Sequence, residues 1–147
     1  MRYLLFEPFH GAAGDMVTGA LLSLGADQKT VAEAMRSIVS DPTFSIVNRS
    51  GIQAVRVETH ATKSSRTLEE VIARVKEAHA PGPAIEMAAR VFRRISEAEE
   101  SVHGPHAHFH EVGADDAIAD VIGACTALHT LKTDGVCLLY TSDAADE

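Results

Sequence analysis

The sequence predicts an α/β (α+β) fold in which a small sheet is layered with helices in a single domain. Its 147 residues are the length of one domain, and that length is enough to bury a hydrophobic core. Hydrophobic residues make up 46% of the chain and charged residues 23%, which is typical of a folded globular protein. Short apolar runs alternate with segments in which apolar residues recur at helical spacing, and this alternation predicts mixed strands and helices.

The predicted strands lie near the start and in the middle of the chain. The apolar run Tyr3–Phe6 ends before a turn and predicts a buried strand. Residues Phe44–Asn48 and Ile52–Thr59 predict two strands joined by a turn at Ser50-Gly51. Their alternation changes phase near Ala54, which is compatible with a β-bulge there and leaves the register of the two strands open.

Five helices are predicted from apolar residues that recur with a period of about 3.6. Asp27 is a predicted N-cap, and Thr67 and Glu70 have the spacing of a capping box. Gly104 is expected to end the fourth helix. The predicted helices cover residues 16–24, 28–38, 68–75, 84–102 and 116–131.

The last ten residues differ from the rest of the chain. Leu138, Leu139 and Tyr140 begin like a strand, and the polar residues after them complete no element. We therefore expect one domain over residues 2–137 and an atypical tail over residues 138–147. An ending of this kind predicts a truncated chain, a fragment of a longer protein.

The charge balance limits the classes of partner. Lys and Arg number 13 and Asp and Glu 21, so the formal net charge is −8. An acidic chain without a basic patch argues against binding to nucleic acid or to an anionic membrane surface. No apolar run reaches the roughly 20 residues of a spanning helix, and the first residues do not resemble a signal peptide. Cys125 and Cys137 make no disulfide framework, so a cytoplasmic location is expected.

The strongest chemical motif is a histidine-rich segment. Four of the eight histidines, His103, His106, His108 and His110, lie within eight positions and are followed by Glu111. Side chains alternate in an extended segment, so the last three histidines would share one face. Three imidazoles and a carboxylate at this spacing can bind Zn²⁺, Ni²⁺ or Co²⁺. The alternatives are a solvated loop that binds metal adventitiously, and histidines that are packed in the core with hydrogen-bond partners.

A pair of aspartates follows the histidines, at the start of the last predicted helix. Asp116 and Asp120 lie on one side of that helix, where like charges four residues apart destabilise the helix unless a cation lies between them. The same side carries the small residues Ala119, Gly123 and Ala127. This predicts that something approaches the helix closely, and we expect both carboxylates to face the histidines. In the alternative interpretation, Asp115 or Asp116 caps the helix and Asp120 is a surface charge.

A third candidate site lies in the turn after the first strand. Residues Gly11, Gly14 and Asp15 join a strand to a helix, an arrangement that resembles a phosphate cradle. It matches neither the P-loop nor the dinucleotide-binding fingerprint. Glu7, His10 and Asp15 are alternatively metal ligands, or Asp15 is a plain helix cap. Because one pocket is expected in a small domain, we predict that this turn lies beside the histidine segment.

Two blocks of the sequence together resemble the LarC family of nickel-insertion proteins. The blocks are Phe9–Met16 and Val102–Asp116, which are similar to the family in content and in separation. The resemblance covers residues 2–136. It implies a CTP-dependent nickel chelatase, a metal-inserting lyase. Such an enzyme places nickel into pyridinium-3,5-bisthiocarboxylic acid mononucleotide during maturation of the nickel-pincer cofactor of lactate racemase.

The resemblance also implies ligands and partners. Nickel is then the substrate metal, and CTP is expected for the full-length protein. The expected partners are the pyridinium mononucleotide, an acceptor protein for the nickel-pincer cofactor and a second copy of the chain. The implied metal ligands are the candidates His106, His108, His110, Glu111, Asp116, Asp120 and His10. The implied binding site for the mononucleotide is Gly11, Gly14 and Asp15.

Two other functions stay open. A binding module would carry nickel or zinc as a chaperone or store and would catalyse nothing. A metal-dependent phosphohydrolase would use the same carboxylates and histidines to activate water. The three functions differ in what they need, since a chelatase requires a sulfur-bearing organic acceptor and a nucleotide. A store binds several ions without an acceptor, and a hydrolase turns over phosphoesters with metal alone.

Overall fold

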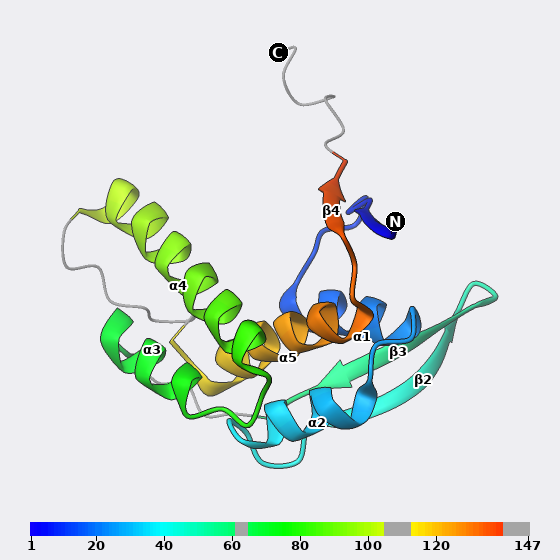
Figure 1. The fold of residues 1–147 in the computed structure, drawn as a ribbon, viewed down its shortest axis with the longest axis horizontal. Helices are drawn as coiled ribbons and strands as arrows, with labels where there is room; N and C mark the ends of the chain where they lie inside the picture. The colour runs from blue at the N-terminus through cyan, green and yellow to red at the C-terminus, as the bar shows by residue number, and fades with distance from the viewer. Residues whose placement is uncertain (61–64, 105–112, 140–147) are drawn as a thin grey trace, which may run out of the picture.

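The computed structural model describes residues 1–60, 65–104 and 113–139. In these ranges five helices and two small sheets form one α/β domain, which confirms the predicted fold class (Figure 1). No helix in these ranges is long and apolar enough to cross a membrane. The elements are, in order, β1 (Tyr3–Phe6), α1 (Gly14–Ser23), α2 (Gln28–Arg36), β2 (Thr43–Arg49), β3 (Ile52–Glu58), α3 (Leu68–Lys76), α4 (Gly82–His103), α5 (Asp115–Leu131) and β4 (Gly135–Leu138).

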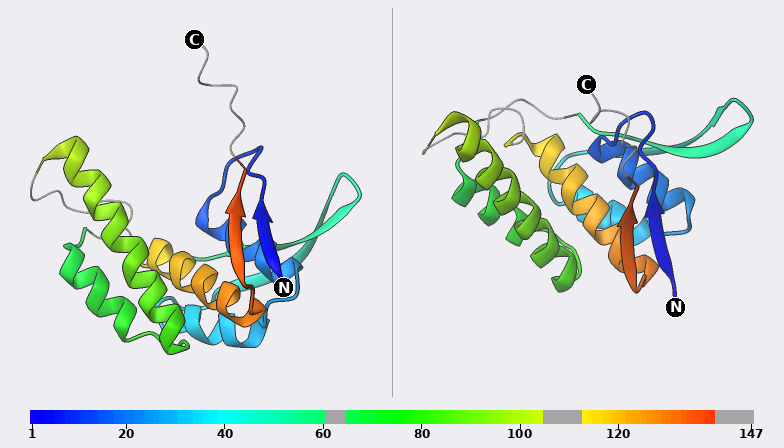
Figure 2. Two further views of the ribbon diagram at one scale, coloured as in Figure 1. Left: turned by 45° about the horizontal axis from the view of Figure 1, so that its top comes forward. Right: turned by 90° about the horizontal axis from the view of Figure 1, so that it is seen from above.

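The strands form two separate two-stranded sheets in the described part of the chain, where the sequence indicated one small sheet. β1 and β4 pair in parallel, from Tyr3 opposite Gly135 to Phe6 opposite Leu138. β2 and β3 form an antiparallel hairpin whose turn projects beyond the helices, while β3 packs against α1 (Figures 1 and 2). The helices therefore carry most of the packing, and α1 connects them to the hairpin.

The prediction that β1 is buried is wrong. Tyr3 is 64% exposed and Leu5 is 53% exposed. Leu4 is buried in the core, and Phe6 is partly buried against it. The apolar run therefore has one covered face, with Leu4 and Phe6, and one open face, with Tyr3 and Leu5.

The hairpin is more regular than its sequence indicated. β2 and β3 pair in one continuous register, with Ala54 directly opposite Val47, so the register that the sequence left open contains no bulge at Ala54. Ile52, which suggested the change of phase, is 72% exposed beside the turn, so its apolar side chain does not mark a buried face. The predicted turn at Ser50-Gly51 is confirmed. Both residues have positive φ, 52° and 84°, as in a type I′ turn.

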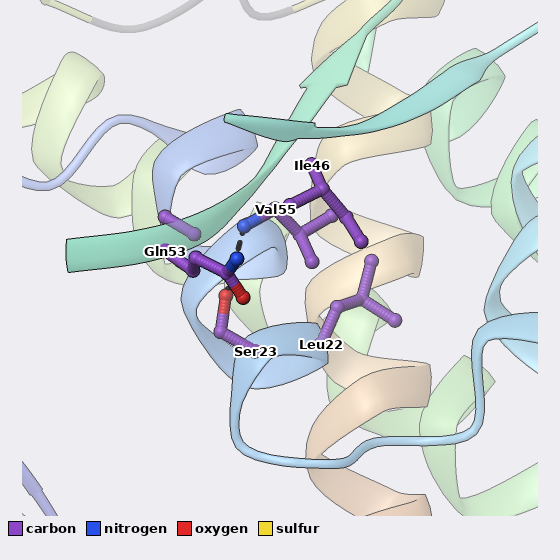
Figure 3. Close-up of a pocket in the computed structure, with 6 residues that line it drawn as sticks. Leu22, Ser23, Ile46, Gln53 and Val55 are labelled. Carbon is purple, nitrogen blue, oxygen red and sulfur yellow. Dashed lines mark hydrogen bonds between the residues drawn. The ribbon is translucent and has the colours of Figure 1, made fainter. Parts of the chain in front are cut away.

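α1 supports the outer edge of β3 (Figure 3). The Val55 N–H donates a hydrogen bond to the Ser23 hydroxyl oxygen at 2.9 Å, and a Cβ added to Gly19 would collide with the Val55 carbonyl oxygen. Beside this contact is an open cavity of about 210 Å³, lined by Leu22, Ser23, Ile46, Gln53, Ala54 and Val55. None of these side chains is a titratable group. The cavity lies at the opposite end of α1 from Asp15, so it is not a candidate for metal chemistry.

α5 is the centre of the helical layer and contacts the other four helices. The predicted apolar stripe is confirmed at Ile118 and Ile122, which are fully buried. The side of small residues is covered as well, since Ala119 is fully buried and a Cβ added to Gly123 would be 2.8 Å from the sulfur of Met35. The predicted close approach is confirmed, and at Gly123 the approaching group is a side chain of α2.

Local hydrogen bonds confirm several predicted helix ends. The Thr67 hydroxyl oxygen accepts from the Glu70 N–H and the Glu70 carboxylate accepts from the Thr67 N–H, which is the capping box at α3. The Asp27 carboxylate accepts from the Lys29 N–H at the start of α2. Gly104 follows α4 with a φ of 84°. These ends depend on neighbouring residues alone, so a local sequence pattern predicts them.

Candidate functional site

The start of α1 lies against the first turns of α5. A Cβ added to Gly14 would be 2.7 Å from the Cβ of Asp120, so the helices approach one another where α1 has no side chain. The Thr18 hydroxyl lies 3.1 Å from the Gly14 carbonyl oxygen and 3.3 Å from the Asp120 carbonyl oxygen, and it bridges the two helices. This contact brings Asp15 of α1 to the side of α5 that carries Asp116 and Asp120.

Asp15 and Asp116 hold matching positions in their helices. Each is the second residue of its helix, where the helix dipole favours a negative charge. The Oδ1 of Asp15 accepts a hydrogen bond from the Met16 N–H at 2.9 Å, and the Oδ1 of Asp116 accepts one from the Ala117 N–H at 2.8 Å. Both carboxylates are therefore oriented by the backbone of their own helices.

Asp120 is the most unusual of the three carboxylates. Its Oδ1 is buried and has no hydrogen-bond partner among the residues that the structure describes. Burial, and then the negative charges of Asp15 and Asp116, raise the pKa of Asp120 to about 7. In the described ranges, no Lys or Arg side chain forms an ion pair with any of the three. Three acids without a neutralising partner attract a cation.

The three carboxylates do not by themselves form a metal site. Within residues 1–60, 65–104 and 113–139, no group of three or more His, Cys, Asp or Glu side chains is placed to hold a metal ion. Oxygen ligands alone also suit Mg²⁺ or Ca²⁺, whereas nickel binds readily to imidazole. The other predicted metal ligands, His106, His108, His110 and Glu111, lie outside the described residues. Their position beside Asp116 and Asp120 stays a prediction.

Asp115 does not belong to the unneutralised group. Its Oδ1 lies 2.8 Å from Nη2 of Arg66 and 3.7 Å from Nε of Arg74. The N-cap of α5 is Ala114, whose side chain makes no capping hydrogen bond, so the interpretation of Asp115 or Asp116 as the N-cap is wrong. Sequence reasoning missed both arginines, because residues so far apart in the chain form no local pattern.

The turn before α1 is exposed to solvent. The Gly11 N–H donates to the Pro8 carbonyl oxygen at 3.1 Å, so this amide already has an acceptor. His10 is exposed in the same turn. A mononucleotide site at Gly11, Gly14 and Asp15 stays a prediction. The negative charge of Asp15 would repel a free phosphate at this turn.

The pKa of Asp120 predicts how the stability of the metal-free chain depends on pH. The pKa of about 7 in the folded chain exceeds the ordinary aspartate pKa of 3.8, so between these two pH values the folded state binds more protons than the unfolded state. The free energy of unfolding should therefore fall as the pH rises from about 4 to 7. Urea unfolding at several pH values should give a steeper fall for the wild type than for Asp120→Asn. Equal pH dependence of the two proteins would contradict the assignment.

Known proteins resemble this chain over nearly all of its length. The model of a family described as "Nickel insertion protein" matches residues 4–143. A "Putative nickel insertion protein" of Methanococcoides burtonii is 42% identical over an alignment of 142 positions, which covers 92% of this chain and 36% of the relative. Proteins with the same description from Methanosarcina barkeri and Geobacter sulfurreducens are 43% and 36% identical, over 143 and 146 residues.

The chain spans little more than a third of these relatives. The alignments with the two further relatives also cover 92% of this chain, and they cover 36% and 38% of those relatives. No solved structure matches the chain. Because the family model matches most of its residues, the chain belongs to the nickel insertion protein family.

Proposed function

We propose that this chain binds Ni²⁺ and passes it to an organic acceptor, as the metal-handling part of a nickel insertion protein. The observation that carries the proposal is the buried Oδ1 of Asp120, which lacks a hydrogen-bond partner in the described part and is flanked by Asp15 and Asp116. Family membership supports nickel as the metal. In the sequence, His110 and Glu111 precede Asp116 by six and five residues, close enough to complete the ligand set.

The two ligand types have different tasks in this proposal. Neutral imidazoles of His106, His108 and His110 select a nitrogen-binding metal over Mg²⁺. The carboxylate of Asp120 exchanges a proton for the metal near neutral pH, because its pKa is raised to about 7. Uptake of a proton by Asp120 would in turn weaken its hold on the metal and favour release. A site that loosens its metal on protonation suits a protein that must pass Ni²⁺ on.

The acceptor that we propose is pyridinium-3,5-bisthiocarboxylic acid mononucleotide, the precursor of the nickel-pincer cofactor of lactate racemase. Its thiocarboxylate sulfur atoms are softer ligands than carboxylate oxygen, so nickel would move from oxygen and nitrogen to sulfur. This makes the full-length protein a chelatase of the lyase class, and we assign the use of CTP to that full-length protein. The basis is the resemblance of the blocks 9–16 and 102–116 to the LarC family.

A second candidate is a nickel chaperone or store without catalysis. It would use the same residues, since the carboxylates of Asp15, Asp116 and Asp120 and the neighbouring histidines would hold nickel without any catalysed step. The two candidates separate in one experiment. The nickel-loaded full-length protein is mixed with the pyridinium acceptor, with and without CTP, and transfer is followed by the absorbance of the nickel–sulfur product. Transfer supports the chelatase, and retention of nickel supports the store.

Loss of two histidines should weaken nickel binding by the isolated chain. His108→Ala/His110→Ala removes two imidazole ligands, and the expected loss of affinity is at least about tenfold, as for lesser changes around metal ligands. Calorimetric titration with Ni²⁺ at neutral pH measures it, and the wild-type affinity should also fall below about pH 6. His60→Ala/His79→Ala is the matched control, since both of these histidines are exposed. Equal affinity of the wild type and the first variant would refute the histidine site.

A further inference from the structure

Arg66 connects the start of α3 to the start of α5. The capping box of Thr67 and Glu70 fixes the backbone directly after Arg66. From there the side chain of Arg66 reaches Asp115, with Nη2 2.8 Å from Oδ1, and its Nη1 donates a hydrogen bond to the Gly113 carbonyl oxygen. The side chains of Arg66 and Asp115 are 22% and 25% exposed, so this contact is largely shielded from water. One guanidinium thus holds two points of the chain at the start of α5.

Arg74 adds a second cation to the same carboxylate. Its Nε lies 3.7 Å from Oδ1 of Asp115, and its Nη2 donates to the Ile38 carbonyl oxygen at 2.8 Å. The described part of the chain therefore places two arginines at Asp115 and forms no ion pair with Asp116 or Asp120. The first turns of α5 therefore have two different sides. Asp115 faces the two arginines, whereas Asp116 and Asp120, which have no ion pair in the described part, lie on the side of α1.

The rotation of α5 about its own axis determines both where Asp115 points and where Asp116 and Asp120 point. Successive residues of a helix differ by about 100° in direction, so fixing Asp115 toward α3 also fixes the directions of Asp116 and Asp120. We propose that Arg66 is a positioning residue for metal binding, which holds the start of α5 in the rotation that turns Asp116 and Asp120 toward Asp15. The inference rests on the proposed function, since it takes these carboxylates as the place where the cation binds.

The sign of the change in nickel affinity separates positioning from a simple effect of charge. Arg66→Gln removes a positive charge near a cation site, so electrostatics alone would strengthen the binding of Ni²⁺. Positioning requires the opposite, a loss of about 10–100-fold, which is typical when a residue that orients metal ligands is removed. Arg66→Lys keeps the charge, and it cannot hold Gly113 and Asp115 together in one planar fork. It should therefore also lose affinity.

The experiment is calorimetric titration of the full chain with Ni²⁺, at a temperature where circular dichroism shows every variant folded. Arg94→Gln is the matched control, because Arg94 is 84% exposed in its ion pair with Glu97. Wild-type affinity in Arg66→Lys, or tighter binding by Arg66→Gln, would overturn the positioning role. If Arg66→Gln does not fold, Arg66→Lys alone decides between the two outcomes.

Failure of this inference can be told apart from failure of the proposed function. Asp120→Asn is titrated in the same series. Weaker binding by Asp120→Asn together with unchanged binding by both Arg66 variants would remove the role of Arg66 and leave the nickel site in place. Unchanged binding by Asp120→Asn would remove these carboxylates from the nickel site, and the inference about Arg66 would fall with it.

Discussion

Asp120→Asn is expected to stabilise the metal-free chain and to weaken its binding of nickel. The carboxylate is half-buried beside Asp15 and Asp116, and its charged form is disfavoured enough to raise its pKa to about 7. An amide of the same shape removes the buried charge and the repulsion. Allowing for the partial exposure of Asp120, the gain in the free energy of unfolding is about 1–2 kcal/mol, or a few degrees in melting temperature. The affinity for Ni²⁺ should fall at least about tenfold, because a ligand is lost.

Thermal unfolding without metal and calorimetric titration with Ni²⁺ measure the two effects. Asp41→Asn is the matched control, because it removes the same charge from an exposed residue with positive φ, a conformation that asparagine adopts readily. The control should leave the nickel affinity unchanged. If metal-free Asp120→Asn were less stable than the wild type, the Asp120 carboxylate would not be destabilising the fold. If its affinity for Ni²⁺ were unchanged, Asp120 would not be a nickel ligand. Opposite changes in stability and in function are expected where a site has been retained at a cost to folding.

The helices could be predicted from the sequence because their information is local. The capping box at Thr67 and Glu70 needs only a spacing of three residues, and the structure contains both of its hydrogen bonds. The buried stripe of α5, with Ile118 and Ile122, follows from the helical period. The same period placed Asp116 and Asp120 on one side of the predicted helix. The small residues on that side indicated that another part of the chain or a ligand approaches this helix closely.

The sequence did not show which elements cover each face of a strand, or which residues lie beside a given charge. Tyr3 and Leu5 were expected in a buried strand, and they are exposed because a strand of four residues does not reveal which elements cover its faces. Ile52 left the register of the hairpin open for the same reason. The partners of Asp115 are the clearest case, because Arg66 meets it only after α3 and α5 have packed. The sequence around a charged residue does not show which opposite charge the tertiary structure will place beside it.

Gly14→Ala should damage both the fold and the site. The added Cβ would lie 2.7 Å from the Cβ of Asp120, a distance that requires α1 and α5 to move apart. Overpacking of this kind costs about 1–3 kcal/mol of the free energy of unfolding. Asp15, the next residue along α1, would move with the helix, and we expect about a tenfold loss of Ni²⁺ affinity, since ligand geometry is sensitive to small displacements. Urea unfolding and calorimetric titration are the measurements.

Two comparisons make the Gly14→Ala result specific to the contact between α1 and α5. Gly82→Ala introduces the same methyl group at the start of α4, where nothing lies within 4 Å of the new Cβ, so both stability and affinity should stay close to wild type. In an Asp120→Asn background the Cβ of residue 120 is retained, so Gly14→Ala should still cost stability. Its further effect on nickel affinity should be smaller than in the wild type, because Gly14→Ala displaces Asp15 relative to Asp120, and the Asp120 carboxylate has already been removed. Full additivity of the two affinity losses would mean that α1 and Asp120 serve nickel binding independently, which the single-site arrangement of α1 and α5 does not allow.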